Sequence, residues 1–335
     1  MKFSLVLCTY MRPESICRCL DSIVKQSKIP DEVLIIDGSL NECSGQAISK
    51  KNYQLPIRYF YVDPEHRGLT RQRNFGVSMV SEDIDVVVFM DDDVVVSENY
   101  FTEIEKTYLE NENTIGVGGI TTNEIKWKKV EPNEPEELGY FTYDGWKRRE
   151  DIRYRLRKLL GLVSSQPPGQ SSGSGQDRPI GALPPSGKIY KVDNLIGLNM
   201  SYKKSVFKDI SFSTFFEGYG LYEDKDFSLQ ASKFGNIFIN TKANVEHHHD
   251  PLGRPNYIKY GKMVVWNGWR VWRVATPNPS FKNKFIWWTT TIFLTYIRFG
   301  NFVVGPERKT AIEDFIGRNI SIISLIFTKP DMSDV

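Results

Sequence analysis

Residues 86–96 read VVVFMDDDVVV, so that Asp91, Asp92 and Asp93 interrupt an otherwise apolar, β-branched run. A strand buried on both faces of a parallel sheet has this near-continuous apolar composition, whereas an unpaired buried carboxylate costs several kcal/mol. Two interpretations are open. The acids form a solvated turn between two strands, or they hold a divalent cation and a diphosphate at the carboxyl end of a parallel strand, where α/β sheets bind ligands.

Apolar strands and helical patterns alternate before this run, which predicts a parallel sheet with right-handed crossovers. The expected elements are strands over residues 3–8, 32–36 and 57–62 and helices over residues 14–26 and 68–77. The last helix carries Arg71 and Arg73 in its first turns. Cations there oppose the helix dipole, so we interpret them as favouring a bound anion such as phosphate.

Composition narrows the class of protein. A formal net charge of +2 over 335 residues argues against nucleic acid as the principal partner. The four cysteines all lie before residue 44 without zinc-site spacing, so we expect small buried side chains in a reducing compartment. The apolar run over residues 3–8 is too short for a signal peptide, and we therefore expect a cytoplasmic location.

The middle of the chain is polar and less regular. Residues 115–120 are an expected strand, and residues 147–158 carry seven cations and two anions on a predicted helix. That helix presents either an ordinary solvated face or a surface for anionic lipid or an acceptor phosphate. Residues 164–187 are rich in Ser, Gly, Pro and Gln and are predicted to form a flexible loop.

A second acidic cluster and a histidine run follow. Glu223 and Asp224 open a predicted helix that ends at Gly235, where plain capping of the helix dipole is an alternative to chemistry. A short strand over residues 237–239 precedes His247, His248 and His249. On an extended segment His247 and His249 point to the same side, which favours metal coordination about as much as a structural role.

The C-terminal region is aromatic and basic, with five of the seven tryptophans between positions 266 and 288. Residues 285–297 lack charge but end at Arg298, too short a run to span a bilayer. Two interpretations are equally open: a helical core, or a surface that associates with an anionic membrane at its interface.

Six segments in order resemble the inverting family-two glycosyltransferases of the GT-A fold, over roughly residues 3 to 250. They are LVLCTYMRP (5–13), EVLIIDGS (32–39), GLTRQRNFGV (68–77), FMDDDVVV (89–96, the DxD motif), NLIGLNMSYKK (194–204) and YEDKDFSLQASKFG (222–235, the ED motif). The fold implied by this resemblance is a Rossmann-type, mostly parallel α/β sheet, followed here by a C-terminal helical extension.

The resemblance also implies roles. Residues that would bind the nucleotide-diphosphate sugar are Thr9, Tyr10, Arg12, Asp37, Arg73, Asp91 and Asp92. Asp93 with His247, or with the competing His249, would hold Mn²⁺ or Mg²⁺, and Asp224 beside Glu223 would be the general base. Acceptor-binding residues would be Asn199, Glu217 and Gly218, and the acceptor a glycan or lipid-linked saccharide of the cell-surface polysaccharide type. The location implied is cytoplasmic, with a peripheral site on the inner membrane face as a second possibility.

Other classes fit less well. A sugar nucleotidyltransferase would favour a Gly-rich phosphate loop after the first strand, and a dehydrogenase would need GxGxxG there, but residues 5–13 contain no glycine. A catalytically inactive binding scaffold predicts a damaged acid set, yet the acids and the histidine run are all present.

We therefore expect four consecutive regions. They are a nucleotide-sugar-binding half (1–120), a polar insertion with a flexible loop (121–188), an acceptor and catalytic half (189–255) and a helical region that is a candidate for membrane association (256–335).

Overall fold

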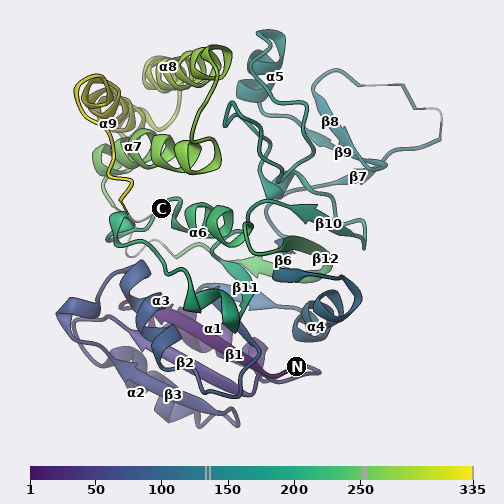
Figure 1. Cartoon of the computed structure of the whole chain (residues 1–335), viewed down its shortest axis with the longest axis vertical. Coiled ribbons are helices and arrows are strands. Elements are labelled where there is room, and N and C mark those ends of the chain that lie inside the picture. Colours follow the sequence, from purple (N-terminus) through teal and green to yellow (C-terminus); the bar gives the residue numbers. More distant parts are fainter. Residues whose placement is uncertain (133, 136, 251–254, 334–335) are drawn as a thin grey trace. The chain divides into compact units, whose positions relative to one another are not determined.

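The computed structural model describes residues 1–132, 134–135, 137–250 and 255–333, which divide into two compact units (Figure 1). The first unit comprises Met1–Glu131, Thr142–Arg148 and Ile180–Gly253, and the second comprises Pro132–Phe141, Arg149–Pro179 and Arg254–Val335. Each unit is therefore assembled from segments that are far apart in the sequence.

The first unit is built on a nine-stranded sheet with the order β10-β12-β6-β11-β4-β1-β2-β3, and β5 pairs with β12. The strands are β1 (Phe3–Thr9), β2 (Glu32–Asp37), β3 (Ile57–Tyr61), β4 (Val86–Asp91), β5 (Val94–Val96), β6 (Thr114–Thr121), β10 (Ile189–Val192), β11 (Asn199–Lys203) and β12 (Asn236–His247). Strands β4, β1, β2 and β3 run parallel, whereas β11 is antiparallel to both β4 and β6. The predicted mixed α/β class is confirmed.

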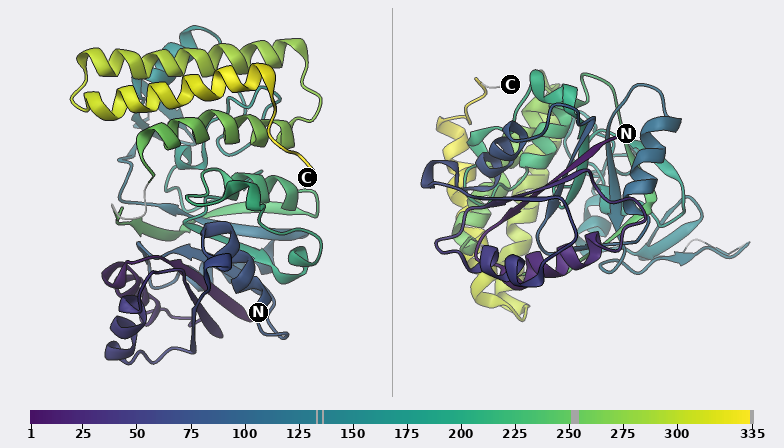
Figure 2. Two further views of the ribbon diagram at one scale, coloured as in Figure 1. Left: turned by 90° about the vertical axis from the view of Figure 1, so that its left-hand side faces the viewer. Right: turned by 90° about the horizontal axis from the view of Figure 1, so that it is seen from below.

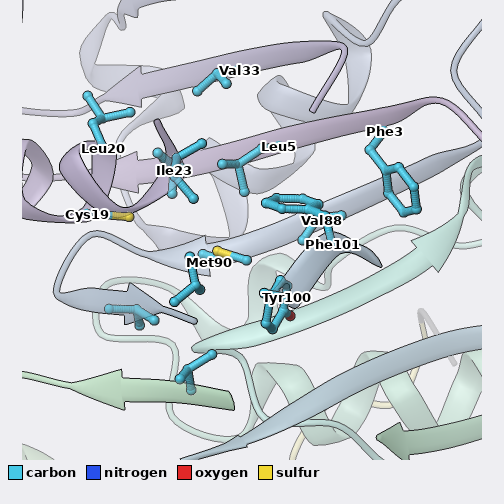
Figure 3. Close-up of a cluster of buried hydrophobic side chains, with 14 of the residues drawn as sticks. Phe3, Leu5, Cys19, Leu20, Ile23, Val33, Val88, Met90, Tyr100 and Phe101 are labelled. Carbon is cyan, nitrogen blue, oxygen red and sulfur yellow. The ribbon is translucent and has the colours of Figure 1, made fainter. Parts of the chain in front are cut away.

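Helices cover both faces of this sheet, so that its central strands are buried on both sides. The helices of the first unit are α1 (Pro13–Ile23), α2 (Cys43–Lys51), α3 (Leu69–Ser78), α4 (Tyr100–Glu110) and α6 (Glu223–Ala231), with 3₁₀ turns η1 (Pro64–His66), η2 (Ile180–Ala182), η3 (Lys204–Lys208) and η4 (Thr214–Phe216). In β1, Leu5 and Leu7 belong to one apolar cluster, drawn in Figure 3, and Val6 to the other. Strand β1 therefore reads as a continuous apolar run.

The acidic run lies where β4 ends. Asp91 is the last residue of β4, and Asp92 and Asp93 form the turn into β5. The turn is not solvated, because Asp92 is 2% exposed and Asp93 is 5% exposed. The acids therefore form a turn, as the first interpretation predicted, but a buried one at the carboxyl end of a parallel strand, and a cation and diphosphate at this place stay a prediction.

The predicted helix over residues 147–158 is corrected by the structure. Residues Trp146–Arg149 form β9, which joins β7 (Lys128–Lys129) and β8 (Tyr140–Tyr143) in a separate three-stranded sheet, and the helix α5 covers only Ile152–Leu159. The reason is a hairpin turn at Asp144 and Gly145, which both have positive φ. An Asp-Gly pair is the favoured two-residue connection between antiparallel strands.

One further predicted helix ends elsewhere. Helix α6 ends at Ala231 rather than at Gly235. The strand expected over residues 237–239 is much longer, since β12 runs to His247.

The second unit contains three long helices, α7 (Tyr257–Ala275), α8 (Phe281–Val304) and α9 (Arg308–Phe327), and α9 packs against both of the others (Figure 2). The stretch predicted to be a flexible loop makes contacts with other residues of this unit. The Trp272 indole donates to the Gly173 carbonyl at 2.9 Å, and the Arg178 guanidinium pairs with Glu150 at 2.6 Å and stacks on Phe141. Among the described residues, no helix has the length and apolar character needed to cross a bilayer.

Candidate functional site

The site lies in the first unit, where β1, β2 and β4 end side by side. The registers place Thr9 opposite Asp37 and Cys8 opposite Asp91. Next to them, Asp92 accepts a hydrogen bond from the Thr9 hydroxyl at 2.6 Å and one from Arg12 Nη1 at 3.0 Å. Burial raises the pKa of Asp92 to about 7, although Arg12 and Thr9 oppose this shift. Residues at the carboxyl ends of the parallel strands thus hold the carboxyl group of Asp92 in place.

Asp93 is the acid that faces the histidine run. Strand β5 pairs with β12 so that Val94 lies opposite His247, and this brings Asp93 Oδ1 to 3.3 Å from His247 Nε2. Oδ2 accepts the Asp250 backbone N–H at 3.2 Å, while Oδ1 is buried and has no hydrogen-bond partner in the part of the chain that the structure describes. Burial alone would raise the pKa of Asp93, but His247 and the Asp250 N–H lower it to about 2. The result is an ionised carboxylate with one oxygen open toward an imidazole.

A third group of ligand atoms lies beside this pair. Glu124 Oε1 is 2.9 Å from His247 Nδ1 and 2.9 Å from His249 Nε2, and these three ligand atoms lie within 4.8 Å of one another. Burial would lower the pKa of His247, but the neighbouring carboxylates of Asp93 and Glu124 raise it to about 9. Sequence reasoning missed Glu124, which lies in a polar stretch that carries no pattern.

Arg73 joins the first acidic cluster to the second. Its guanidinium is 2% exposed, pairs directly with Glu223, lies 3.5 Å from Asp91 and donates to the Gly197 carbonyl at 3.0 Å. Burial would lower the pKa of Arg73, but the charges of Glu223 and Asp91 raise it. A phosphate at this helix start stays a prediction, and the anions that the structure places beside Arg73 are the carboxylates of Glu223 and Asp91.

Asp224 is half-buried at the start of α6 and is held by the backbone. Its Oδ2 accepts the Gly197 N–H at 2.8 Å, and its Oδ1 accepts the Lys225 N–H at 2.7 Å. The Gly197 carbonyl accepts a hydrogen bond from Arg73, and Arg73 also lies beside Asp91. Gly197 and Arg73 therefore connect Asp224 to the acid that ends β4. A fixed carboxylate with a solvent-accessible side can accept a proton.

The other predicted donor residues take different places. Asp37 is fully buried and accepts hydrogen bonds from the Tyr59 hydroxyl at 2.6 Å and the Ser39 N–H at 2.8 Å, whereas Tyr10 is 41% exposed. Asp37 therefore lies beside Thr9 at the carboxyl ends of β1 and β2.

The predicted acceptor residues do not form one group. Asn199 is buried in β11, where its side-chain oxygen accepts the Gly119 N–H at 2.6 Å. Glu217 pairs with Arg71 at the surface, and the Gly218 carbonyl accepts the Leu69 N–H at the start of α3. Asn199 thus has a place in the sheet, and the acceptor roles stay predictions.

Replacing Arg73 by methionine is expected to destabilise the protein by about 3–5 kcal/mol, because Glu223 would be left as a buried charge without its partner. Urea unfolding followed by circular dichroism measures the effect. The matched variant Arg71→Met removes the exposed pair with Glu217 and should cost about 1 kcal/mol or less. Equal losses for the two variants would show that the buried pair is not structural.

Comparison with known proteins finds similarity to one family over the N-terminal part of the chain. A family model described as "Glycosyl transferase family 2" matches residues 4–165, which contain the acidic run, Arg12 and Arg73. The matched residues make up just under half of the chain. This similarity agrees with the resemblance of the motifs to family-two glycosyltransferases.

Two curated relatives match parts of the chain. Glycosyltransferase GlyA of Streptococcus pneumoniae is 27% identical over 165 residues, which are 49% of this chain and 22% of the relative. Glucosyl-dolichyl phosphate glucuronosyltransferase of Haloferax volcanii is 28% identical over 134 residues, 39% of this chain and 42% of the relative. The matches therefore span less than half of each curated relative.

Solved structures support the fold. TarS residues 1–349 of S. aureus superimpose with a TM-score of 0.51 and 15% identity, covering 95% of this chain and 81% of that chain. GalNAc-T7, solved with UDP, GalNAc and Mn²⁺, gives a TM-score of 0.53 and 15% identity, covering 81% of this chain and 50% of that one. At these identities the comparison shows a shared GT-A fold.

Proposed function

We propose that the chain is a metal-dependent, inverting glycosyltransferase that moves a sugar from a nucleotide-diphosphate donor to a hydroxyl of a glycan or lipid-linked saccharide. The observation that carries this proposal is the open Oδ1 of Asp93, buried and facing His247 Nε2. Asp224 supplies the carboxylate for proton transfer. It accepts the Gly197 N–H, and the Gly197 carbonyl accepts a hydrogen bond from Arg73, which lies beside Asp91.

The donor set fits a divalent cation. Asp93 and His247 would hold Mn²⁺ or Mg²⁺, since a carboxylate and an imidazole are ligands these ions accept, Mn²⁺ more readily with nitrogen. When bound, the cation neutralises charge on the departing diphosphate. The similar fold of GalNAc-T7, solved with Mn²⁺ and UDP, supports this choice.

The strand ends would receive the donor nucleotide. Asp37 would accept the N3 hydrogen of a pyrimidine base. Its neighbour Thr9 ends β1, and the exposed Tyr10 follows directly after that strand. Arg12 already neutralises Asp92 and lies 3.6 Å from Asp93, so it can orient these carboxylates toward the ribose and diphosphate. Asp91 is the partly exposed acid of the three and would contact the donor directly.

Asp224 would act as the general base. Its two backbone hydrogen bonds fix the carboxylate while leaving lone pairs for an acceptor hydroxyl. Proton transfer to Asp224 would activate the acceptor oxygen for attack on the anomeric carbon opposite the nucleotide. A single displacement of this kind inverts the anomeric configuration.

A panel of nucleotide sugars tests the proposal. Purified protein with Mn²⁺ and candidate saccharide acceptors should release nucleotide from at least one donor, and proton NMR of the product should show the opposite anomeric configuration to that of the donor. Retention of configuration would contradict a single displacement with Asp224 as base. Donor binding without turnover on any acceptor would favour the inactive binding scaffold.

Glu124 would be a positioning residue in this site. By accepting a hydrogen bond from His247 Nδ1 it would hold the tautomer whose Nε2 faces Asp93, as carboxylates behind metal-binding histidines do. This arrangement favours His247 over His249 as the metal ligand.

Replacing Glu124 by glutamine should therefore weaken Mn²⁺ binding by about 10- to 100-fold, because the partner that orients His247 loses its charge. Titration of free Mn²⁺ by electron paramagnetic resonance measures the affinity. The matched variant His249→Asn should stay within about twofold of the wild type if His249 is not a ligand of the cation. A larger loss for His249→Asn than for His247→Asn would reverse the assignment.

A cytoplasmic enzyme, peripheral to the inner membrane face, is the proposed setting. Cys8, Cys17, Cys19 and Cys43 are unpaired thiols within the described residues, as expected in a reducing compartment. A lipid-linked saccharide acceptor would lie at that surface.

A further inference from the structure

The polarity of helix α9 is inverted relative to a helix of a soluble protein. Residues Ile316, Ile320, Ile323 and Ile326 recur at helical spacing and are 40–65% exposed. The opposite side of the helix is buried and bears mostly small or polar residues: Ala311, Asp314, Gly317, Arg318, Ser321 and Leu325. A surface helix in water normally buries its apolar stripe and exposes its polar one.

Helix α8, which lies beside α9 in both views of Figure 2, shows the same pattern. Its exposed side carries Phe285, Ile292, Tyr296 and Phe299, whereas its buried positions are Trp287, Thr290 and Thr295. We call the exposed residues of α8 and α9 named in this and the preceding paragraph the outer face.

The interior of the helical unit combines an apolar cluster (Val265, Trp269, Trp272, Trp287 and Leu325) with polar and small residues at the contacts of α9. Asp314 lies between Arg298 at 2.7 Å and Arg318 at 2.8 Å, and so ties α8 to α9. Helices α7 and α9 approach closely at glycines: a Cβ at Gly317 would lie 2.1 Å from the Ile258 carbonyl oxygen. Polar side chains and small residues between helices, with apolar side chains outside, are the arrangement of helices surrounded by lipid.

Cations flank the outer face. Lys282 and Lys284 at the start of α8 and Arg308 and Lys309 at the start of α9 are exposed, and Glu307 is the only exposed carboxylate between residues 281 and 328. The basic helix α5 repeats the inversion, since Arg157 is buried while Leu159 is 83% exposed. Exposed cations beside apolar side chains are complementary to anionic headgroups above an acyl layer.

We propose that the outer face lies in the interface of an anionic lipid bilayer, with the flanking cations at the headgroups. This inference deepens the proposed function, because it rests on the membrane location and assigns the surface that makes the contact. The tryptophans of the C-terminal region pack in a helical core, one of the two sequence interpretations, and the proposed lipid contact is made by the outer face. The exposed cations beside the outer face favour an anionic lipid surface over a second copy of the chain, whose like charges would repel them.

Vesicle flotation of the full chain tests the proposal at low salt, with phosphatidylcholine and phosphatidylglycerol in equal parts. The wild type should float, and Ile326→Glu and Phe285→Glu should each lower the bound fraction by about tenfold, because a charge replaces an inserted apolar side chain. The matched control is Leu109→Glu on α4, where the leucine is 69% exposed, against 65% for Ile326. This control should float like the wild type.

The remaining outcomes separate the alternatives. No flotation of the wild type, or equal losses for Leu109→Glu and Ile326→Glu, would overturn the proposal, and equal binding to pure phosphatidylcholine would overturn its anionic part. A wild-type dimer that Ile326→Glu converts to monomer, without flotation, would assign the outer face to a second copy instead. Nucleotide release measured on the same preparations reports separately on the proposed enzymatic function.

Discussion

Replacing Asp224 by asparagine is expected to lower kcat by a factor of about 10²–10⁴, the usual contribution of a general base, while the donor dissociation constant changes little. The amide keeps the shape of the carboxylate and can retain one of the two backbone hydrogen bonds from Gly197 and Lys225. It cannot take the acceptor proton. Steady-state kinetics together with donor binding by calorimetry separate the two effects.

Asp226 offers the matched control for this variant. It lies in the same first turn of α6 but is buried and accepts a hydrogen bond from Gln230. If the acids of this turn served only the helix dipole, Asp224→Asn and Asp226→Asn would have similar effects on stability and none specific to kcat. A kcat for Asp224→Asn close to that of the wild type would remove Asp224 from the base role.

The second large effect is expected for Asp93→Asn, which should weaken Mn²⁺ binding by more than about 100-fold, beyond the range for residues that only orient a metal ligand. The carboxamide lacks the charge that His247 and the Asp250 N–H stabilise in the folded protein. Mn²⁺ affinity and nucleotide release at saturating donor should fall together.

A double-mutant cycle sharpens this test. Asp93→Asn and His247→Asn should each abolish tight Mn²⁺ binding, and the double variant should lose little more, because both remove the same site. His248→Asn is the control, since His248 is in the same run but pairs with Glu246 at the surface. Additive losses for Asp93 and His247 would mean that they do not share a cation.

Much of the fold could be predicted because its central strands are buried on both faces. The apolar runs of β1, β2 and β4 and the acids at the end of β4 carry their own signal. The extended histidine run also placed His247 and His249 on one side, and their ring centroids lie 3.9 Å apart.

Other features depend on contacts that no local pattern encodes. Glu124 meets His247 across 123 residues of sequence, and the partner of Arg73 is Glu223, 150 residues away. Strand β9 was missed because its four residues are nearly all charged, although the Asp144-Gly145 turn could have indicated a hairpin. The polarity of α8 and α9 was ambiguous in sequence, since apolar residues at helical spacing do not say which face is buried.

The measurement that tests the central claim most directly is nucleotide release by the wild type before and after removal of divalent cations. With a donor identified from the panel, EDTA should abolish release, and excess Mn²⁺ should restore it for the wild type but not for Asp93→Asn. Undiminished release in EDTA, or full restoration of Asp93→Asn at the Mn²⁺ concentration that suffices for the wild type, would contradict a catalytic cation held by Asp93 and His247.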